Sequence, residues 1–185
     1  MKIIVRKLPE MILDKSFEQI EGLYETCTGK DAMDAFYNSL VRCQYDDSLN
    51  LEDDIVLCKD FLNEINKVIE KNPNKLITFF TLKKMEDTKK MPGRTFCMAQ
   101  CFYIPQWLNK LLINYYPKWV VSERGIKHPD GLDLMVADFL ALIKEDYILS
   151  YPCLVQHMEM KSRIDPRRSS KRQTKYFKDD LEKGE

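Results

Sequence analysis

The chain alternates between short apolar runs and longer segments in which apolar residues recur every three or four positions. The short runs predict strands, and the periodic segments predict amphipathic helices packed on a core. The expected strands cover residues 2–7, 48–52, 76–82, 96–104 and 147–155, the last broken at Pro152. The expected helices cover residues 13–24, 31–40, 59–72, 105–116 and 132–143. This order predicts an α/β fold, with a mixed sheet and helices on both faces.

Polar segments rich in turn-forming residues are expected to connect these elements. Residues 26–29 predict a turn, residues 83–94 a mobile loop, and residues 117–131 a further loop. The length of 185 residues suits a single domain, which we expect at 1–160. A basic tail, expected to be only partly ordered, follows at 161–185.

Three adjacent acids, Glu52, Asp53 and Asp54, stand between apolar residues, where a solvated loop would show polar neighbours. Ligands of open α/β sheets bind beyond the carboxyl ends of strands, which is where Asp54 is expected. Carboxylate oxygens suit Mg²⁺ or Mn²⁺, and these ions also bind substrate phosphates. The alternative is that the acids favour the N-terminus of the helix beginning near Lys59.

Two further segments carry candidate chemistry. His157 ends the last expected strand, and a histidine joined to carboxylates would favour Mn²⁺ over Mg²⁺. The alternative for His157 is a histidine that is only structural or exposed. Asp130 and Asp133 flank Gly131 at the start of a helix, where either is a candidate general base toward an acceptor hydroxyl. The alternative for Asp130 and Asp133 is an ordinary helix cap.

Charge is balanced overall, with 29 basic and 29 acidic residues, but residues 161–178 hold eight Lys or Arg against the single acid Asp165. Such a run is able to hold a phosphate of any origin, or to be simply solvated. The candidate clamp for a diphosphate consists of Arg163, Arg167, Arg168, Lys171, Arg172 and Lys175. Tyr176 and Phe177 leave a nucleic-acid role open.

The six cysteines are expected to be reduced, because we expect no signal peptide at the N-terminus and a core that is large enough without disulfide bonds. We therefore expect a cytoplasmic protein. Cys97 and Cys101 lack a second pair, which disfavours a zinc site. No apolar run is long enough for a membrane span. Neither a dinucleotide-binding glycine motif nor a P-loop is present, which disfavours hydride transfer and P-loop phosphotransfer.

Four motifs, taken in order, resemble those of a small GT-A-type glycosyltransferase of the kind found in phage and bacterial genomes. The resemblance runs from about Ile3 to Phe177. Its parts are the acidic Leu51-Glu52-Asp53-Asp54, the segment from Met98 through Gln100 to Pro105, the turn Asp130-Gly131-Leu132-Asp133, and the ending Pro152-Cys153-Leu154-Val155-Gln156-His157.

The resemblance implies a role for each matching residue. Asp54, Glu52 and His157 would ligate Mn²⁺ or Mg²⁺, and Asp133 or Asp130 would address the acceptor. The nucleotide sugar, of UDP-linked type, would contact Glu52, Asp53, Gln100 and Arg163. The acceptor would be a glycan, a protein or a modified nucleic acid. Helix 31–40 would border the donor pocket, and the tail would cover it.

Two departures from the family pattern leave a second hypothesis open. Cys153 replaces a small serine, and residues 46–51 are poorer in apolar residues than the family norm. The front half of the chain is also short, which implies a minimal nucleoside pocket. The alternative to an enzyme is a non-enzymatic nucleic-acid or phosphate-binding module, or a protein-interaction module, that keeps the same fold.

Overall fold

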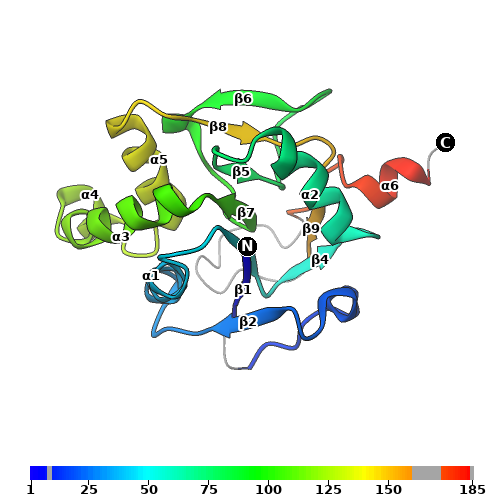
Figure 1. The fold of residues 1–185 in the computed structure, drawn as a ribbon, viewed down its shortest axis with the longest axis horizontal. Coiled ribbons are helices and arrows are strands. Elements are labelled where there is room, and N and C mark those ends of the chain that lie inside the picture. The colour runs from blue at the N-terminus through cyan, green and yellow to red at the C-terminus, as the bar shows by residue number, and fades with distance from the viewer. Residues whose placement is uncertain (8–9, 160–171, 184–185) are drawn as a thin grey trace.

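The computed structural model describes residues 1–7, 10–159 and 172–183. They form a mixed α/β domain around a seven-stranded sheet of order β2-β1-β3-β7-β5-β8-β6, accompanied by a two-stranded sheet of β4 and β9 (Figure 1). The strands are β1 (Lys2–Arg6), β2 (Tyr24–Cys27), β3 (Ser48–Glu52), β4 (Ile55–Leu57), β5 (Ile77–Thr78), β6 (Lys89–Pro92), β7 (Cys101–Ile104), β8 (Asp146–Leu149) and β9 (Val155–His157). The expected fold class is confirmed.

Helices cover both faces of the main sheet, as expected (Figure 1). One face carries α1, α3, α4 and α5, and the other carries α2 and the small sheet. The helices are α1 (Ala32–Arg42), α2 (Phe61–Lys71), α3 (Gln106–Val120), α4 (Glu123–Lys127), α5 (Leu132–Leu142) and α6 (Lys178–Glu182), with 3-10 turns η1 (Lys15–Ile20) and η2 (Gly93–Thr95). Among the described residues, no helix is both long and apolar enough to cross a bilayer.

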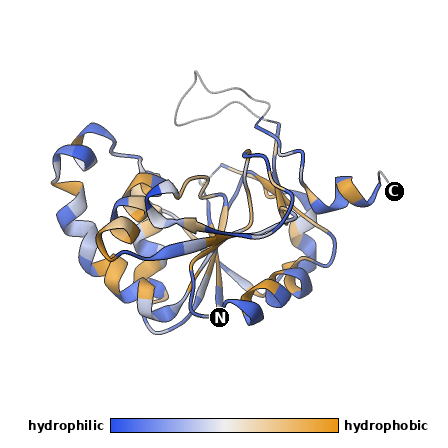
Figure 2. Cartoon of the chain, turned by 90° about the horizontal axis from the view of Figure 1, so that it is seen from above, coloured by the Kyte–Doolittle hydropathy of each residue, from blue (hydrophilic) through white to orange (hydrophobic). Residues whose placement is uncertain are grey.

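The central strands divide their side chains between two cores. In β7, Cys101 and Tyr103 join the core under α2, whereas Phe102 and Ile104 join the core under α1, α3 and α5. This alternation follows from the period of two along a strand. Orange, apolar strands run through the centre of Figure 2, and the helices turn their blue, polar sides outward.

A buried polar cluster explains the low apolar content before the acids. Asn50 is fully buried in β3, where its side-chain oxygen accepts a hydrogen bond from Ser39 Oγ at 2.8 Å. Its amide group donates to Ser48 Oγ at 3.1 Å. Because these groups satisfy one another, a polar strand is buried here without an unpaired Asn50 amide.

Three sequence predictions about the first half of the sheet are wrong in detail. The helix expected at 13–24 is only the short η1. Gly22 has a positive φ of +75°, which is not a helical conformation, and Tyr24–Cys27 then pairs with β1 as strand β2. The turn expected at 26–29 therefore begins inside a strand. The strand expected at 76–82 is reduced to β5, because only Ile77 and Thr78 pair with β7 and β8.

Three further predictions are corrected in the second half. The expected loop at 83–94 contains edge strand β6, whose exposed lysines and Pro92 suit a sheet edge. The expected strand at 96–104 begins only at Cys101. Helix α3 continues through Pro117 to Val120, and α4 follows, so most of the loop expected at 117–131 is helical.

The tail beyond residue 171 packs on the domain. Phe177 is buried, and its backbone pairs with that of Cys153 in an isolated parallel β-bridge. The Lys59 amide donates to both carboxylate oxygens of Asp179, at 3.1 and 3.0 Å. These contacts place α6 at the start of α2. The described end of the tail is thus part of the domain rather than a separate solvated segment.

A thiol-labelling experiment tests this core. All six cysteines are free thiols, as expected, and five of them are buried, whereas Cys97 is partly exposed. Burial raises the pKa of Cys58 to about 12 and that of Cys43 to about 11, which suppresses their reactive thiolates. Ellman's reagent at pH 8 should therefore label Cys97 rapidly and the others only after unfolding. Rapid native labelling of a Cys97→Ser variant would show that the core is packed differently.

Candidate functional site

The first half of the site is made by two parallel strands that end side by side. The register of β1 and β3 pairs Arg6 with Glu52 at their carboxyl ends. The Arg6 guanidinium lies 3.7 Å from the Glu52 carboxylate. The carboxyl edge of parallel strands is the usual ligand position in such sheets. The expected placement of the acids beyond this strand is therefore confirmed.

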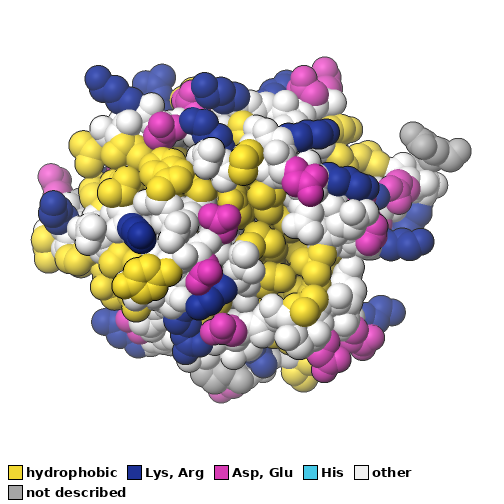
Figure 3. All heavy atoms as spheres, in the orientation of Figure 1, with side chains coloured by type: hydrophobic (Ala, Val, Ile, Leu, Met, Phe, Trp, Pro, Cys, Tyr) yellow, Lys and Arg dark blue, Asp and Glu magenta, His cyan; other side chains and the backbone are white. Residues whose placement is uncertain are grey.

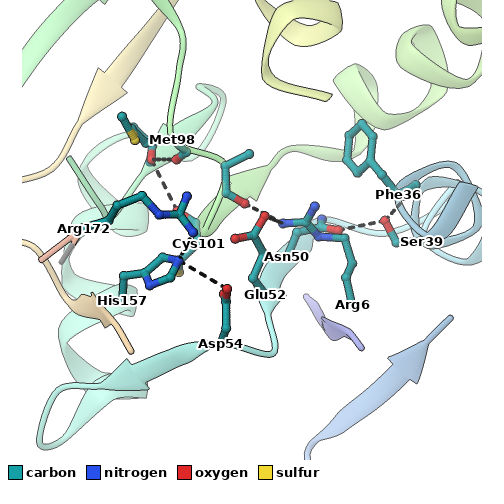
Figure 4. A network of polar contacts seen from close by, with 12 residues as sticks. Arg6, Phe36, Ser39, Asn50, Glu52, Asp54, Met98, Cys101, His157 and Arg172 are labelled. Carbon is teal, nitrogen blue, oxygen red and sulfur yellow. Dashed lines mark hydrogen bonds and ion pairs between the residues drawn. The ribbon is translucent and has the colours of Figure 1, made fainter. Parts of the chain in front are cut away.

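The second half is made by the small antiparallel sheet. Strand β4 follows the acids directly, and its register with β9 pairs Ile55 with His157. The Met158 amide also donates to the Asp54 carbonyl at 2.9 Å. These backbone bonds bring His157 Nε2 to 3.2 Å from Asp54 Oδ2 (Figure 4). The expected meeting of these two distant side chains is confirmed, whereas their role as metal ligands stays a prediction.

The presence of β4 rules out the helix-capping interpretation of the acids. Helix α2 begins at Phe61, and Asp60 occupies its N-cap position. Strand β4 separates Glu52, Asp53 and Asp54 from that helix end. The acids therefore belong to the edge of the sheet.

The backbone fixes the orientation of the His157 ring. Nδ1 lies 2.7 Å from the Met158 carbonyl oxygen, which is only able to accept, so Nδ1 carries a proton and donates. Nε2 then points at Asp54 from a side chain that is 1% exposed. A histidine whose other nitrogen is held by a carbonyl in this way is oriented as metal-binding histidines are.

Arg172 approaches the same nitrogen from the tail. Its Nη2 lies 2.5 Å from His157 Nε2, and Figure 4 shows the guanidinium directed at the ring. Since arginine is only able to donate, this contact requires the neutral ring with its lone pair on Nε2. The Arg172 Nε is buried, and no described residue bonds to it.

The Asp54–His157 contact by itself favours charge on both partners, and it competes with the Arg172 contact, which needs the neutral ring. Burial opposes ionisation of Asp54, but the hydrogen bond and charge of His157, with the charge of Arg172, outweigh it and lower the pKa of Asp54. Burial likewise opposes charge on His157, but the hydrogen bond with Asp54 outweighs it and raises the pKa of His157. Protonated His157 would donate to Asp54, whereas neutral His157 accepts from Arg172.

Glu52 lies between these two centres and is hard to ionise. Burial and the neighbouring Asp54 charge raise the pKa of Glu52 to about 7, although Arg6 acts in the opposite direction. The side chain keeps 28% of its surface exposed, so it remains open to a ligand. A cation arriving beside Glu52 would therefore favour its charged form.

Arg6 is a functional candidate that sequence reasoning missed. Its side chain is buried, donates to the Ala99 carbonyl, and lies over the rings of Phe36 and Phe102. Its Nε has no hydrogen-bond partner. The available signal was a single arginine ending the apolar run of β1, which becomes informative only once Glu52 is known to pair with it.

The other expected donor-site residues are distributed unevenly. Gln100 lies beside Glu52, because the Glu52 amide donates to the Gln100 carbonyl at 2.8 Å. The Gln100 Oε1 atom is buried and has no partner among the described residues. Asp53 is buried next to the cluster, and its charge contributes to the raised pKa of Glu52. Arg163 lies outside the described residues.

Asp130 and Asp133 lie apart from the acids, at the start of α5. Gly131 occupies the N-cap position and no side chain caps this helix, so neither carboxylate has the expected cap geometry. The Asp133 carboxylate accepts from the Leu134 amide at 3.1 Å, and Asp130 is exposed. In the described part of the chain, no hydrogen bond or ion pair joins either residue to Asp54 or His157.

The donor set around Asp54 suits a divalent cation. Two ligand atoms that each lie about 2.1 Å from a cation, with a right angle between the two bonds, are about 3.0 Å from each other. This separation is close to the 3.2 Å between Asp54 Oδ2 and His157 Nε2. Asp54 Oδ1 is buried and has no hydrogen-bond partner among the residues that the structure describes. Across residues 1–7, 10–159 and 172–183, no three His, Cys, Asp or Glu side chains form a ready-made metal group. A cation here would therefore complete its shell with water or phosphate, as Mg²⁺ does.

A separate pocket of about 540 Å³ lies between α3, α4 and α5. Trp119 and Arg124 on its wall both bond to Asp138, at 3.1 and 2.5 Å, so these polar groups satisfy one another. None of the expected site residues lines it. The chemistry therefore concentrates at the edge of the sheet.

Comparisons with known proteins support the fold alone. No protein-family model matches the chain, and no curated protein sequence matches it. Among solved structures, the chain is similar to "Crystal Structure of A197 from STIV", with a TM-score of 0.56 and 10% identity over 85% of this chain and 86% of that one. At this identity, the similarity establishes a shared α/β architecture.

Proposed function

We propose that the protein is a metal-dependent glycosyltransferase that moves a sugar from a nucleoside-diphosphate donor to an acceptor hydroxyl. The observation that carries this proposal is the meeting of Asp54 and His157 at 3.2 Å, with Asp54 Oδ1 left without a partner in the part of the chain that the structure describes. Glu52 borders the same site. An oxygen and nitrogen donor set that includes one histidine favours Mn²⁺ over Mg²⁺.

The charges around the pair suit a diphosphate. Arg6 and Arg172 flank the acids from opposite sides in Figure 4, and each has a buried Nε without a partner. Arginine binds phosphate oxygens through paired donors. When bound, a divalent ion would neutralise the diphosphate leaving group as a Lewis acid. The two guanidinium groups would orient the same diphosphate and share its charge.

The acceptor side of the proposal depends on Asp133 or Asp130. Either carboxylate would take the proton of the acceptor hydroxyl. The donor pocket would be bordered by α1, which is supported by the packing of Phe36 against the buried Arg6. Gln100 would meet the nucleotide through its unpaired Oε1.

A thermal-shift screen tests the proposal. A ligand present at a hundred times its Kd and bound only to the folded protein adds about 2.7 kcal/mol, which raises the Tm by roughly 5–10 °C in a protein of this size. We expect this rise with UDP-sugars and Mn²⁺ together, and a much smaller one with either alone. UMP with Mn²⁺ serves as the control, because it lacks the diphosphate.

The outcomes also separate the alternative hypothesis. Basic and acidic side chains are interspersed over the face shown in Figure 3, so this face offers no continuous basic surface for a nucleic acid. A Tm unchanged by every nucleotide sugar, together with salt-sensitive binding of single-stranded nucleic acid, would favour the phosphate-binding module instead.

A further inference from the structure

The fold holds Arg172 in place, because the backbone that follows it is anchored. The Thr174 amide donates to Gln156 Oε1 at 2.8 Å, and Gln156 Nε2 donates back to the Thr174 carbonyl at 2.9 Å. Thr174 and Gln156 are both buried. Gln156 directly precedes His157 in β9, so the same contact sets the spacing between Arg172 and the ring.

The guanidinium competes for the ring nitrogen that a bound cation would need. His157 Nε2 lies 3.2 Å from Asp54 Oδ2, and Arg172 Nη2 approaches that nitrogen to 2.5 Å. A lone pair on Nε2 serves either the guanidinium or a metal ion, but not both. The positive charge of Arg172 also lowers the pKa of Asp54, as a metal ion would do.

A second observation points from Arg172 to an anion. Its Nε is buried and lacks a hydrogen-bond partner among the described residues, although an unpaired buried donor is costly. Phosphate oxygens satisfy paired guanidinium donors well. The contact with His157 therefore leaves the guanidinium incompletely satisfied.

We propose that Arg172 is a tethered substitute for the cation in the metal-free protein. On this proposal, which rests on the proposed function, an arriving divalent ion displaces the guanidinium from Nε2. The released donors then bind the diphosphate of the nucleotide. Each ligand thereby favours the other, since the ion frees the arginine and the diphosphate holds it away from the histidine.

Calorimetric titration with Mn²⁺ alone, and then with UDP at saturating Mn²⁺, tests the proposal. If Arg172 occupies the site about nine-tenths of the time, Arg172→Ala should bind Mn²⁺ about tenfold more tightly than the wild type. The same variant should bind UDP about tenfold more weakly at saturating Mn²⁺, because it lacks the phosphate donors. Lys183→Ala is the matched control, since it removes a tail charge that is 76% exposed and lies outside the candidate clamp, and it should change neither affinity more than about twofold.

The outcomes separate this proposal from the proposed function. Equal or weaker Mn²⁺ binding by Arg172→Ala, in a variant whose Tm shows that it is folded, would overturn the displacement while leaving the metal site intact. Failure of all three proteins to bind Mn²⁺ would overturn both proposals. A change in the Nε2 resonance of His157 in metal-free Arg172→Ala is also expected, and an unchanged resonance would show that Arg172 does not engage the ring in solution.

Discussion

Asp54→Asn is expected to abolish Mn²⁺ binding, with a loss of affinity of more than about a hundredfold. Even groups that only support a metal ligand typically contribute ten- to a hundredfold, and Asp54 is proposed as a ligand itself. Asparagine keeps the shape of the side chain, and its amide group is able to bond with His157 Nε2 whether that nitrogen is protonated or not, so the fold should persist. Calorimetry would measure the affinity, and the UDP-sugar-dependent rise in Tm should disappear with it.

Asp133→Asn is the matched control for this variant. It removes the same charge from a carboxylate that makes no described contact with the Asp54 pair. We expect it to bind Mn²⁺ and UDP normally, and to lose transfer to the acceptor by roughly 10²–10⁴-fold if Asp133 is the base. Normal Mn²⁺ binding by Asp54→Asn would exclude Asp54 from the site.

Arg6→Met should destabilise the fold by about 3 kcal/mol. The side chain is 5% exposed and neutralises Glu52, so its removal leaves a poorly solvated carboxylate beside Asp54. The estimate takes the low end for a broken buried pair, because Glu52 is itself 28% exposed. Urea unfolding at pH 8 gives the change in the free energy of unfolding.

Two comparisons separate the effect of the lost Arg6 charge from the effect of lost packing. Arg42→Met removes a surface pair with Glu25 whose side chains are half exposed, and should cost no more than about 1 kcal/mol. The raised pKa of Glu52 means that the folded protein binds more protons than the unfolded chain near neutral pH. The free-energy cost of burying the Glu52 charge therefore becomes smaller as the pH is lowered. The loss in Arg6→Met should therefore shrink from pH 8 to pH 6. A loss independent of pH would show that packing, not charge, explains the effect.

The sequence was sufficient to predict the strands and helices that frame the site. The apolar run of β1 and the periodic faces of α1, α2 and α5 are local signals, and each appears within a few residues of its expected bounds. The meeting of Asp54 with His157 was also predictable, because the order of the motifs resembled a known family. Here the resemblance supplied a long-range contact that periodicity does not contain.

The elements that the sequence did not predict are those whose structure depends on distant partners. Strand β4 is only Ile55–Leu57, too short for a periodic signal, and it exists because β9 pairs with it. Strand β6 is polar and gains its pairing from β8. In the same way, η1 replaced an expected helix because the residues after Gly22 pair with β1.

The two arginines of the site illustrate the same limit. Arg172 was one of the six cations of the candidate clamp, and nothing in the local sequence separated it from its neighbours. The distinction comes from the contact between Thr174 and Gln156, which joins the tail to β9. Arg6 required the parallel register of β1 with β3, which places it beside Glu52.

The most direct test is the anomalous diffraction of crystals grown with MnCl₂ and UDP, recorded at the manganese absorption edge. The account predicts a single strong peak bonded to both Asp54 and His157 Nε2, with Arg172 turned toward the diphosphate. A manganese peak elsewhere, or bound UDP with Arg172 still on His157 Nε2 and no manganese between the two side chains, would contradict it.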